Sequence, residues 1–164
     1  MPSRPTTATV ASTAVPTGIH LTADGRVLLE QRIAWLREDV LDRLRPHLMG
    51  PERDERDVAQ FERTLAEVGR LEGIIAAAAT LPTPATGRGA RVEPGALVEV
   101  EAQGRVKERI RVRIVHPEEA VLDDERISWT SPLAKALVGS RVGDACEVVS
   151  PSGSWTCVVK RILA

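Results

Sequence analysis

Apolar residues recur at intervals of three and four positions through two consecutive segments, which is the spacing of helices with one buried face. In the first segment, which follows Thr22, they are Leu29, Ile33, Leu36, Val40 and Leu44. In the second they are Val58, Phe61, Leu65 and Val68 and, after a shift of the repeat, Leu71, Ile75 and Ala78. The pattern predicts two amphipathic helices, with Thr22 as the N-cap of the first and a local stutter in the second.

A short segment of helix-breaking residues separates these two helices. Pro46 and the pair Gly50-Pro51 interrupt the helical spacing there. Two helices of similar length with so short a connection bury their apolar faces by folding back on each other. The sequence therefore predicts an antiparallel coiled coil, and each arm should reach on the order of 35 Å at about 1.5 Å per residue.

The periodicity changes after residue 80. Residues 81–89 show no repeat and contain two prolines and two glycines, so they are expected to form a linker. Short β-branched runs then predict strands at residues 97–100, 110–114, 147–149 and 155–162, and only residues 131–138 have a helical pattern. These elements predict a compact, mainly antiparallel sheet with one short helix against it.

The chain is thus predicted to be an α+β protein with four parts. Residues 1–20 form a flexible N-terminal tail, 21–80 the helical hairpin with an acidic tip, 81–89 the linker, and 90–164 the sheet domain. With 43% hydrophobic residues, a chain of 164 residues can bury cores of ordinary size.

Charge and composition restrict the classes of function. The net charge is −1 and aromatic residues make up only 2% of the chain. A protein that grips duplex DNA normally carries a basic excess, and single-stranded nucleic acid is bound by stacking on exposed rings. Direct binding of duplex DNA is therefore not expected, and any link to nucleic acid should run through a protein partner.

The sequence gives no sign of a membrane or secreted protein. No apolar run approaches the roughly 20 residues of a membrane helix. The N-terminal tail has Arg4 as its only Lys or Arg and lacks the apolar core of a signal peptide. A cytoplasmic protein without membrane contact is expected.

Metal and catalytic residues are also scarce. Cys146 and Cys157 are too few for a structural metal site, but a hairpin centred on Pro151 and Ser152 would place them opposite each other, where a disulfide is geometrically conceivable. The three histidines are scattered and are expected at the surface: His20, His47 and His116. No catalytic triad is suggested, so intrinsic enzymatic activity is not expected.

Several ordered motifs resemble the bacterial Gre transcript-cleavage factors. The most informative stretch is residues 127–143, where a turn, a short helix beginning at Ser131-Pro132, and a Gly-rich exit follow one another. Four further matches occur in the family's order: residues 21–25 to its opening Leu-Thr-x-x-Gly, 54–61 to its acidic tip, 69–71 to Gly-Arg-Ile, and 143–153 to its C-terminal Gly-Asp and Pro-x-Gly.

The resemblance implies a partner and a set of roles. In Gre factors the coiled coil enters the secondary channel of RNA polymerase, and an FKBP-like C-terminal domain docks on the channel rim. Asp54 would then help to hold a second Mg²⁺, and Asp57 would orient the water that hydrolyses backtracked RNA. The Mg²⁺ is shared with the polymerase, so the factor holds no tight cofactor and meets the RNA 3′ end only indirectly. By the same resemblance, Ser131 and Pro132 face the polymerase.

The tip also departs from the family pattern. Asp57 stands where the family has Glu, and a misplacement of roughly an ångström can cost about 100-fold in rate. The second helix is about one turn shorter between the tip and Arg70. An alternative alignment of Gly50 would instead put Pro51 and Asp54 in the two carboxylate positions. These departures favour a channel-binding inhibitor that does not promote cleavage.

Three functions remain open at this point: a cleavage-stimulating factor, a non-cleaving inhibitor that blocks the channel, and an FKBP-like isomerase or chaperone. The last has least support, because only Trp129 and Trp155 are available to line a prolyl pocket in the C-terminal half. Five basic residues follow one another closely: Arg105, Lys107, Arg109, Arg111 and Arg113. They are expected to form either a solvated face of a strand or a contact with acidic helices of the polymerase.

Overall fold

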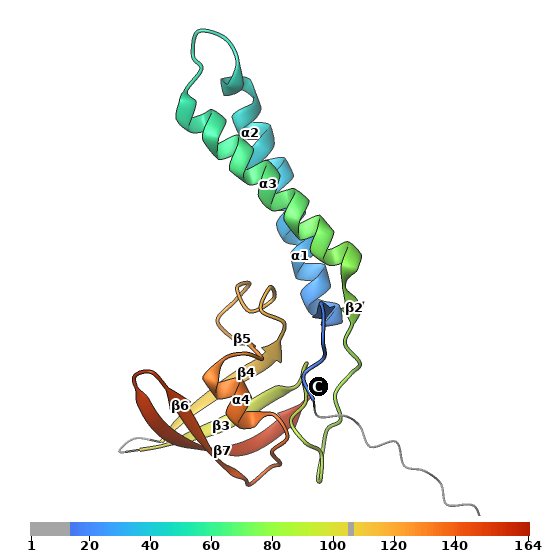
Figure 1. The fold of residues 1–164 in the computed structure, drawn as a ribbon, viewed down its shortest axis with the longest axis vertical. Coiled ribbons are helices and arrows are strands. Elements are labelled where there is room, and N and C mark those ends of the chain that lie inside the picture. Colours follow the sequence, from blue (N-terminus) through green and yellow to red (C-terminus); the bar gives the residue numbers. More distant parts are fainter. Residues whose placement is uncertain (1–13, 105–106) are drawn as a thin grey trace, which may run out of the picture.

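The computed structural model describes residues 14–104 and 107–164, and it has the predicted α+β organisation. A long helical hairpin projects from a small sheet domain, and the bend of the hairpin is its most distant part (Figure 1). In the described ranges, no helix combines the length and the apolar character needed to cross a membrane.

The first arm of the hairpin is helical throughout but changes its winding. It consists of α1 (Ala23–Trp35), a π-helical segment η1 (Leu36–Leu41), α2 (Asp42–Leu44) and a 3₁₀ turn η2 (Arg45–Leu48). In η1, the N–H of Asp42 donates to the carbonyl of Arg37, five residues earlier. The wider turn carries an extra residue and brings Leu41, as well as the predicted Val40, towards the second arm. Pro46 lies in η2, where the regular helix ends.

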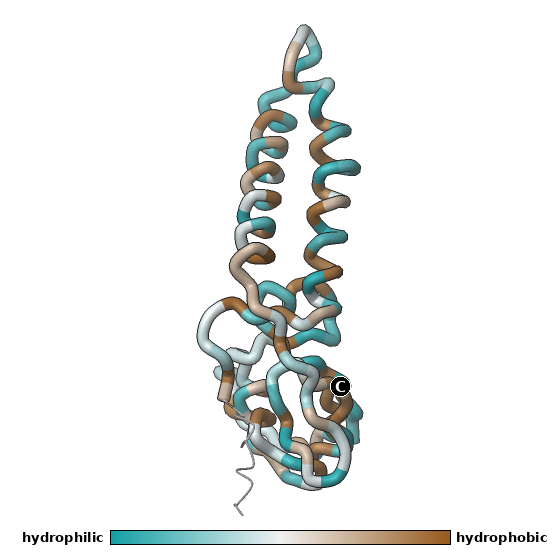
Figure 2. The backbone as a smooth tube through the Cα atoms, turned by 90° about the vertical axis from the view of Figure 1, so that its right-hand side faces the viewer, coloured by the Kyte–Doolittle hydropathy of each residue, from teal (hydrophilic) through white to brown (hydrophobic). Residues whose placement is uncertain are grey.

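The second arm is α3 (Glu55–Ala77), and it buries a different seam from the predicted one. Thr64 is buried, whereas Leu65 is 52% exposed. Besides Thr64, the buried residues of α3 are Val68, Leu71 and Ile74, and partly buried residues pack beside them: Phe61, Ile75 and Ala78. The seam thus differs from the predicted one at two positions, because polar Thr64 takes the place of its apolar neighbour Leu65 and Ile74 is buried in addition to the predicted residues. Figure 2 shows brown hydrophobic and teal hydrophilic positions alternating along both arms.

The base of the hairpin is joined by two short parallel strands. β1 (His20–Leu21) pairs with β2 (Ala79–Thr80). The pairing is extended by hydrogen bonds from the N–H of Ala79 to the carbonyl of Ile19, at 3.0 Å, and from the N–H of Leu81 to that of Leu21, at 2.8 Å. Of the expected N-terminal tail, residues 1–13 lie outside the described residues, and its end at Ile19 and His20 is held by these bonds.

The C-terminal part is a five-stranded sheet in the order β5-β4-β3-β7-β6. Its strands are β3 (Leu97–Gln103), β4 (Glu108–Val115), β5 (Arg126–Ser128), β6 (Ala145–Ser150) and β7 (Gly153–Leu163), and the helix α4 (Pro132–Leu137) precedes β6. The pairings are antiparallel as predicted, except that β5 lies parallel to β4. β5 was not predicted, since three half-buried residues give no alternating pattern.

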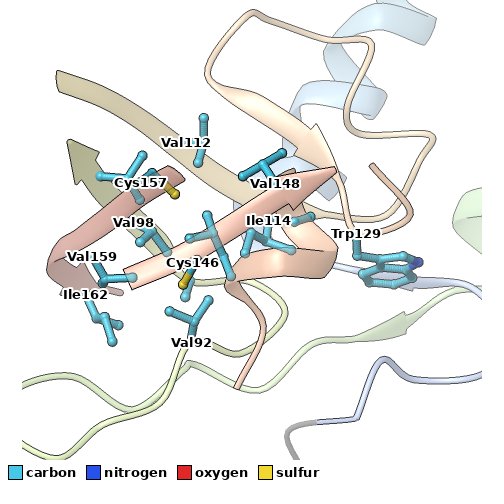
Figure 3. Close-up of a cluster of buried hydrophobic side chains, with 14 of the residues drawn as sticks. Val92, Val98, Val112, Ile114, Trp129, Cys146, Val148, Cys157, Val159 and Ile162 are labelled. Atoms are coloured by element: carbon cyan, nitrogen blue, oxygen red, sulfur yellow. The ribbon is translucent and has the colours of Figure 1, made fainter. Parts of the chain in front are cut away.

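One face of this sheet forms the core with α4. The buried set includes Val98, Val100, Ile114, Leu137 and Val159, together with Leu81 from the linker. Cys146 and Cys157 are register partners across β6 and β7, as the predicted hairpin required, and both are free thiols buried among aliphatic side chains (Figure 3). Burial raises the pKa of the Cys157 thiol to about 11.

Candidate functional site

The far end of the hairpin carries the predicted acidic residues. Asp54 is the N-cap of α3, and its Oδ1 accepts a hydrogen bond from the N–H of Arg56 at 2.8 Å. The segment folds this way because an aspartate before a helical run satisfies one of the free N–H groups of the first turn. Asp54 therefore has a structural task in addition to its candidate chemical one.

The second candidate, Asp57, is in the first turn of α3 and is half-buried. Asp54 as N-cap and Asp57 in the first turn both lie at the start of α3, so their carboxylates are in the same region of the tip. Around them, Arg53 pairs with Glu55 at 3.2 Å, and Arg56 lies between the two candidates in sequence. The tip is thus acidic but partly neutralised.

These residues do not form a metal site by themselves. Across residues 14–104 and 107–164, no group of three or more His, Cys, Asp or Glu side chains is placed to hold a metal ion. Mg²⁺ in proteins is commonly bound by one or two carboxylates plus water and phosphate oxygens. Asp54 and Asp57 can supply at most two carboxylates to such a site, and its remaining ligands would have to come from elsewhere.

The two predicted docking residues are distant from the tip along the chain and lie in the sheet domain. Ser131 is the N-cap of α4, and its Oγ accepts a hydrogen bond from the N–H of Ala134 at 3.3 Å. Pro132 occupies the first helical position, where a missing N–H is harmless, and it is exposed. Local sequence thus determines this turn, and Pro132 offers the more accessible surface.

The basic stretch on β4 lies on the sheet face away from the core, and Arg105 lies outside the described residues. Glu101 on β3 is approached by Lys160 at 3.3 Å and by Lys107 at 3.8 Å. The hydrogen bond from Lys160 lowers the pKa of Glu101. Arg111 pairs with Glu125 at 2.9 Å. The face is therefore a network of ion pairs with a basic excess rather than a uniform row of cations.

Sequence reasoning missed the fully buried charged residue Glu119, in the loop between β4 and β5. Its side chain is 0% exposed and contacts the start of α1 in the hairpin. The one signal available in the sequence was Gly25, a glycine in the first turn of a predicted helix, where a side chain would ordinarily be preferred. His116, in the same loop, was expected at the surface. It is half-buried and packs edge-on against Trp129, with ring centroids 5.1 Å apart.

Comparison with known proteins finds relatives of this sequence. A family described as "Transcription elongation factor, GreA/GreB, C-term" matches residues 87–164. Transcription elongation factor GreA of Mesorhizobium japonicum is 32% identical over 145 residues, which cover 83% of this chain and 91% of that protein. GreA of Acidiphilium cryptum is 42% identical over 86 residues, which cover 52% of this chain and 54% of that protein.

Two solved structures are also similar. GreA factor homolog 1 (Gfh1) of Thermus thermophilus is 31% identical, with a TM-score of 0.38 over 89% of this chain and 99% of that one. The GreA/GreB factor of Nitrosomonas europaea is 19% identical, with a TM-score of 0.40 over 90% of this chain and 100% of that one.

The sequence matches identify the class of protein as a transcription elongation factor. The chain belongs to the GreA/GreB family, because the M. japonicum relative is matched over nearly its whole length. The membership in the Gre family that the sequence motifs indicated is thereby confirmed. Since Gre factors assist another enzyme, family membership also supports the prediction that this chain is not itself an enzyme.

Proposed function

We propose that this chain binds bacterial RNA polymerase and modulates elongation by inserting its hairpin, as an antiparallel coiled coil, into the secondary channel. The observation that carries the proposal is the position of the acidic bend, at the far end of the hairpin from the sheet domain, in a member of the GreA/GreB family (Figure 1). The 23 residues of α3 give an arm of about 35 Å. A narrow arm of that length suits delivery of a tip into a deep channel.

In the first form of the proposal, the tip stimulates cleavage of backtracked RNA. Asp54 and Asp57 then supply carboxylates to a Mg²⁺ held mainly by the polymerase, and the factor needs no bound metal of its own. Asp54 caps α3 through Oδ1. Support for this form comes from the placement of both acids in the region of the first turn of α3.

In the second form, the hairpin blocks the channel without promoting cleavage. The observation that favours this form is the presence of Arg53 and Arg56 among the acidic residues of the tip, where Arg53 pairs with Glu55, so that the net negative charge available to attract Mg²⁺ is smaller. Asp57, which is one methylene shorter than the Glu of the family, also favours the form without cleavage. Docking is common to both forms, so they differ only at the tip.

RNA length in a backtracked elongation complex separates the two forms. Wild-type protein and the Asp54→Asn, Asp57→Asn double variant are compared, alongside run-off transcription from a promoter. Shortening that the double variant abolishes supports cleavage through these carboxylates. Reduced run-off without shortening supports channel blocking, and the absence of both effects contradicts the proposed function.

For the docking surface we propose the turn at Ser131 and Pro132, on an FKBP-like C-terminal domain. Pro132→Ala should weaken polymerase binding while leaving the unfolding temperature nearly unchanged, because Pro132 is exposed. Ser131→Arg should weaken it further but also removes the cap of α4. Lys135→Ala, an exposed change on the same helix, is the matched control. Unchanged binding in both test variants would remove this docking assignment.

An isomerase or chaperone function has less support. A prolyl pocket needs exposed aromatic side chains, whereas Trp129 is 6% exposed and belongs to the core. Trp155 is half-buried beside Ile110 in a shallow depression at the start of β4. An assay of prolyl isomerisation on a short peptide should therefore give the uncatalysed rate.

A further inference from the structure

The loop between β4 and β5, residues 116–125, reaches out of the sheet domain and holds the first turn of α1. Glu119 in this loop is 0% exposed. Its Oε1 accepts a hydrogen bond from the N–H of Thr22 at 2.5 Å, and its Oε2 accepts one from the Thr22 hydroxyl at 2.8 Å. The Thr22 Oγ in turn accepts from the N–H of Gly25 at 2.9 Å. A carboxylate from one part of the molecule therefore completes the helix cap of the other part.

Gly25 provides the space into which this carboxyl group fits. A Cβ atom on residue 25 would lie 2.0 Å from Cδ of Glu119 and 2.2 and 2.4 Å from its two oxygens. No side chain can occupy that position while Glu119 remains in place. A glycine, which weakens a helix relative to alanine, therefore stands at the residue where the two parts of the molecule meet.

Two neighbours of Glu119 reach other parts of the hairpin. Leu122 packs against the hydrophobic cluster of the hairpin, and Glu118 accepts a hydrogen bond from Arg70 of α3 at 2.7 Å. The loop therefore contacts both arms. Because the side chains of Arg70 and Glu118 are 52% and 30% exposed, water screens their ion pair, and the contacts of buried Glu119 and partly buried Leu122 carry most of the attachment.

A second attachment lies where the chain enters and leaves the hairpin. Leu81 donates its N–H to the carbonyl of Leu21, and its side chain is part of the sheet core. One attachment alone would act as a hinge. Two attachments, one through the paired chain segments and one through the β4–β5 loop, restrict the direction in which the hairpin can point.

We propose that Glu119 is a positioning residue that holds the hairpin at one fixed angle to the sheet domain, so that docking of the sheet domain also aims the tip. This inference rests on the proposed function for its consequence at the polymerase, but not for the fixed angle itself. On an arm of about 35 Å, a swing of about 10° displaces the tip by roughly 6 Å. Misplacement of reacting groups by only about 1 Å can cost about 100-fold in rate, so loss of the fixed angle should abolish the action of the tip.

The fixed angle is tested without polymerase, by distances between two spin labels. The labels are attached at Gln60→Cys on α3 and Ser154→Cys on β7, which are both exposed, whereas the native thiols are buried. The otherwise unchanged protein should give one narrow distance distribution. Glu119→Ala should broaden it several-fold, and Glu119→Gln should restore it, because the amide oxygen can still accept from the N–H of Thr22. Glu62→Ala, an exposed change on α3, is the control and should leave the distribution narrow.

A second variant keeps the test valid if Glu119→Ala does not fold. Gly25→Ala places a methyl group where the carboxyl group lies and so displaces Glu119, while alanine itself favours the helix. It should give the same broadening with the helix content retained. A broad distribution in the unchanged protein, or a narrow one in folded Gly25→Ala, would overturn the proposal.

At the polymerase, loss of the fixed angle should leave binding intact but reduce the effect of the protein on transcription. Glu119→Ala should bind polymerase within about 3-fold of the original affinity, since the docking turn is untouched, but should lose at least about tenfold of its effect on RNA length or run-off. Full effect in a variant whose label distances are broad would overturn the role of Glu119 in aiming the tip. If the unchanged protein has no effect on transcription, the proposed function fails, and the label distances still decide the fixed angle.

Discussion

Arg26 of α1 donates a hydrogen bond from its guanidinium group to the main-chain carbonyl of Ala78, at 2.8 Å, and a second one to the carbonyl of Ile75, at 3.1 Å. Ala78 directly follows α3, and Ile75 is in its last turn. These carbonyls have no partners further along the helix, so a cation from the facing arm satisfies them. The Arg26 side chain therefore caps the C-terminal end of the second arm and also links that arm to the first.

Replacing Arg26 tests this closure of the hairpin. Arg26→Ala should lower the free energy of unfolding by about 1 to 3 kcal/mol, because it removes two charge-assisted hydrogen bonds to part-buried carbonyls. Arg43→Ala is the matched control: Arg43 is highly exposed and only 4.0 Å from its partner Asp39. Urea unfolding followed by helical circular dichroism measures both. Equal effects of the two changes would contradict a capping role for Arg26.

The hairpin shows how far periodicity alone can predict a structure. Thr22 as N-cap and the buried face of Leu29, Ile33 and Leu36 were predicted from spacing, because a long amphipathic pattern averages over local exceptions. The single polar residue in the second seam defeated the same method. Thr64 is buried and Leu65 is not, and only the facing arm decides between two adjacent positions.

The register of that seam can be tested with one charge at each position. Leu65→Glu should change the free energy of unfolding by no more than about 0.5 kcal/mol, since the side chain is already half in water. Thr64→Glu should cost about 2 kcal/mol or more, because it places a carboxylate between the arms. Thermal unfolding of the two variants at neutral pH gives the comparison. A larger loss for Leu65→Glu would mean that the predicted seam, not the observed one, is correct.

Some residues of the candidate site could be predicted from local sequence, and others could not. Sequence placed Asp54 at the bend and Ser131 before the short helix, because acidic residues and N-caps have local signatures. It could not find Glu119, which lies in a loop rich in charged residues and whose burial depends on a helix 97 residues away. The three-residue strand β5 was missed for a related reason, since its pairing with β4 is non-local.

The contact between Gly25 and Glu119 predicts a strong coupling between two substitutions. Gly25→Ala alone should destabilise the protein by about 1 to 3 kcal/mol, because the new methyl group overlaps the Glu119 carboxyl group. In a Glu119→Ala background, the same change should be neutral or stabilising by up to about 1 kcal/mol, because the helix preference of alanine remains and the overlap is gone. Unfolding free energies of the four proteins form the cycle. If the two changes in unfolding free energy simply add, Gly25 does not provide the space that the Glu119 carboxyl group occupies.

Burial of Glu119 also predicts a dependence of stability on pH. Loss of water around the carboxyl group raises its pKa above the ordinary 4.5, although hydrogen bonds from Thr22 act in the opposite direction. The folded state therefore binds the proton more tightly than the unfolded state. The resulting contribution to stability is fully present below about pH 4.5 and is lost as pH rises through the raised value.

Glu119→Gln isolates this contribution, because the amide does not titrate and the other ionisable groups are common to both proteins. The free energy of unfolding of the original protein, minus that of the variant, should fall as pH increases from about 4 to about 7. Urea unfolding at intervals across that range supplies the values. A difference that stays flat, or that grows with pH, is incompatible with a raised pKa.

The last prediction separates the two tasks of Asp54. Asparagine caps a helix about as well as aspartate, so Asp54→Asn should keep the hydrogen bond from the N–H of Arg56 while removing the charge. Asp54→Ala loses both and should destabilise the start of α3 by about 1 kcal/mol. Hydrogen exchange at the amides of the first turn measures the difference, and it should be faster in the alanine variant than in the asparagine variant. If the carboxylate serves only as a cap, the asparagine variant will match the original protein in its effect on RNA as well; if it also serves Mg²⁺, exchange will be preserved and the effect on RNA lost.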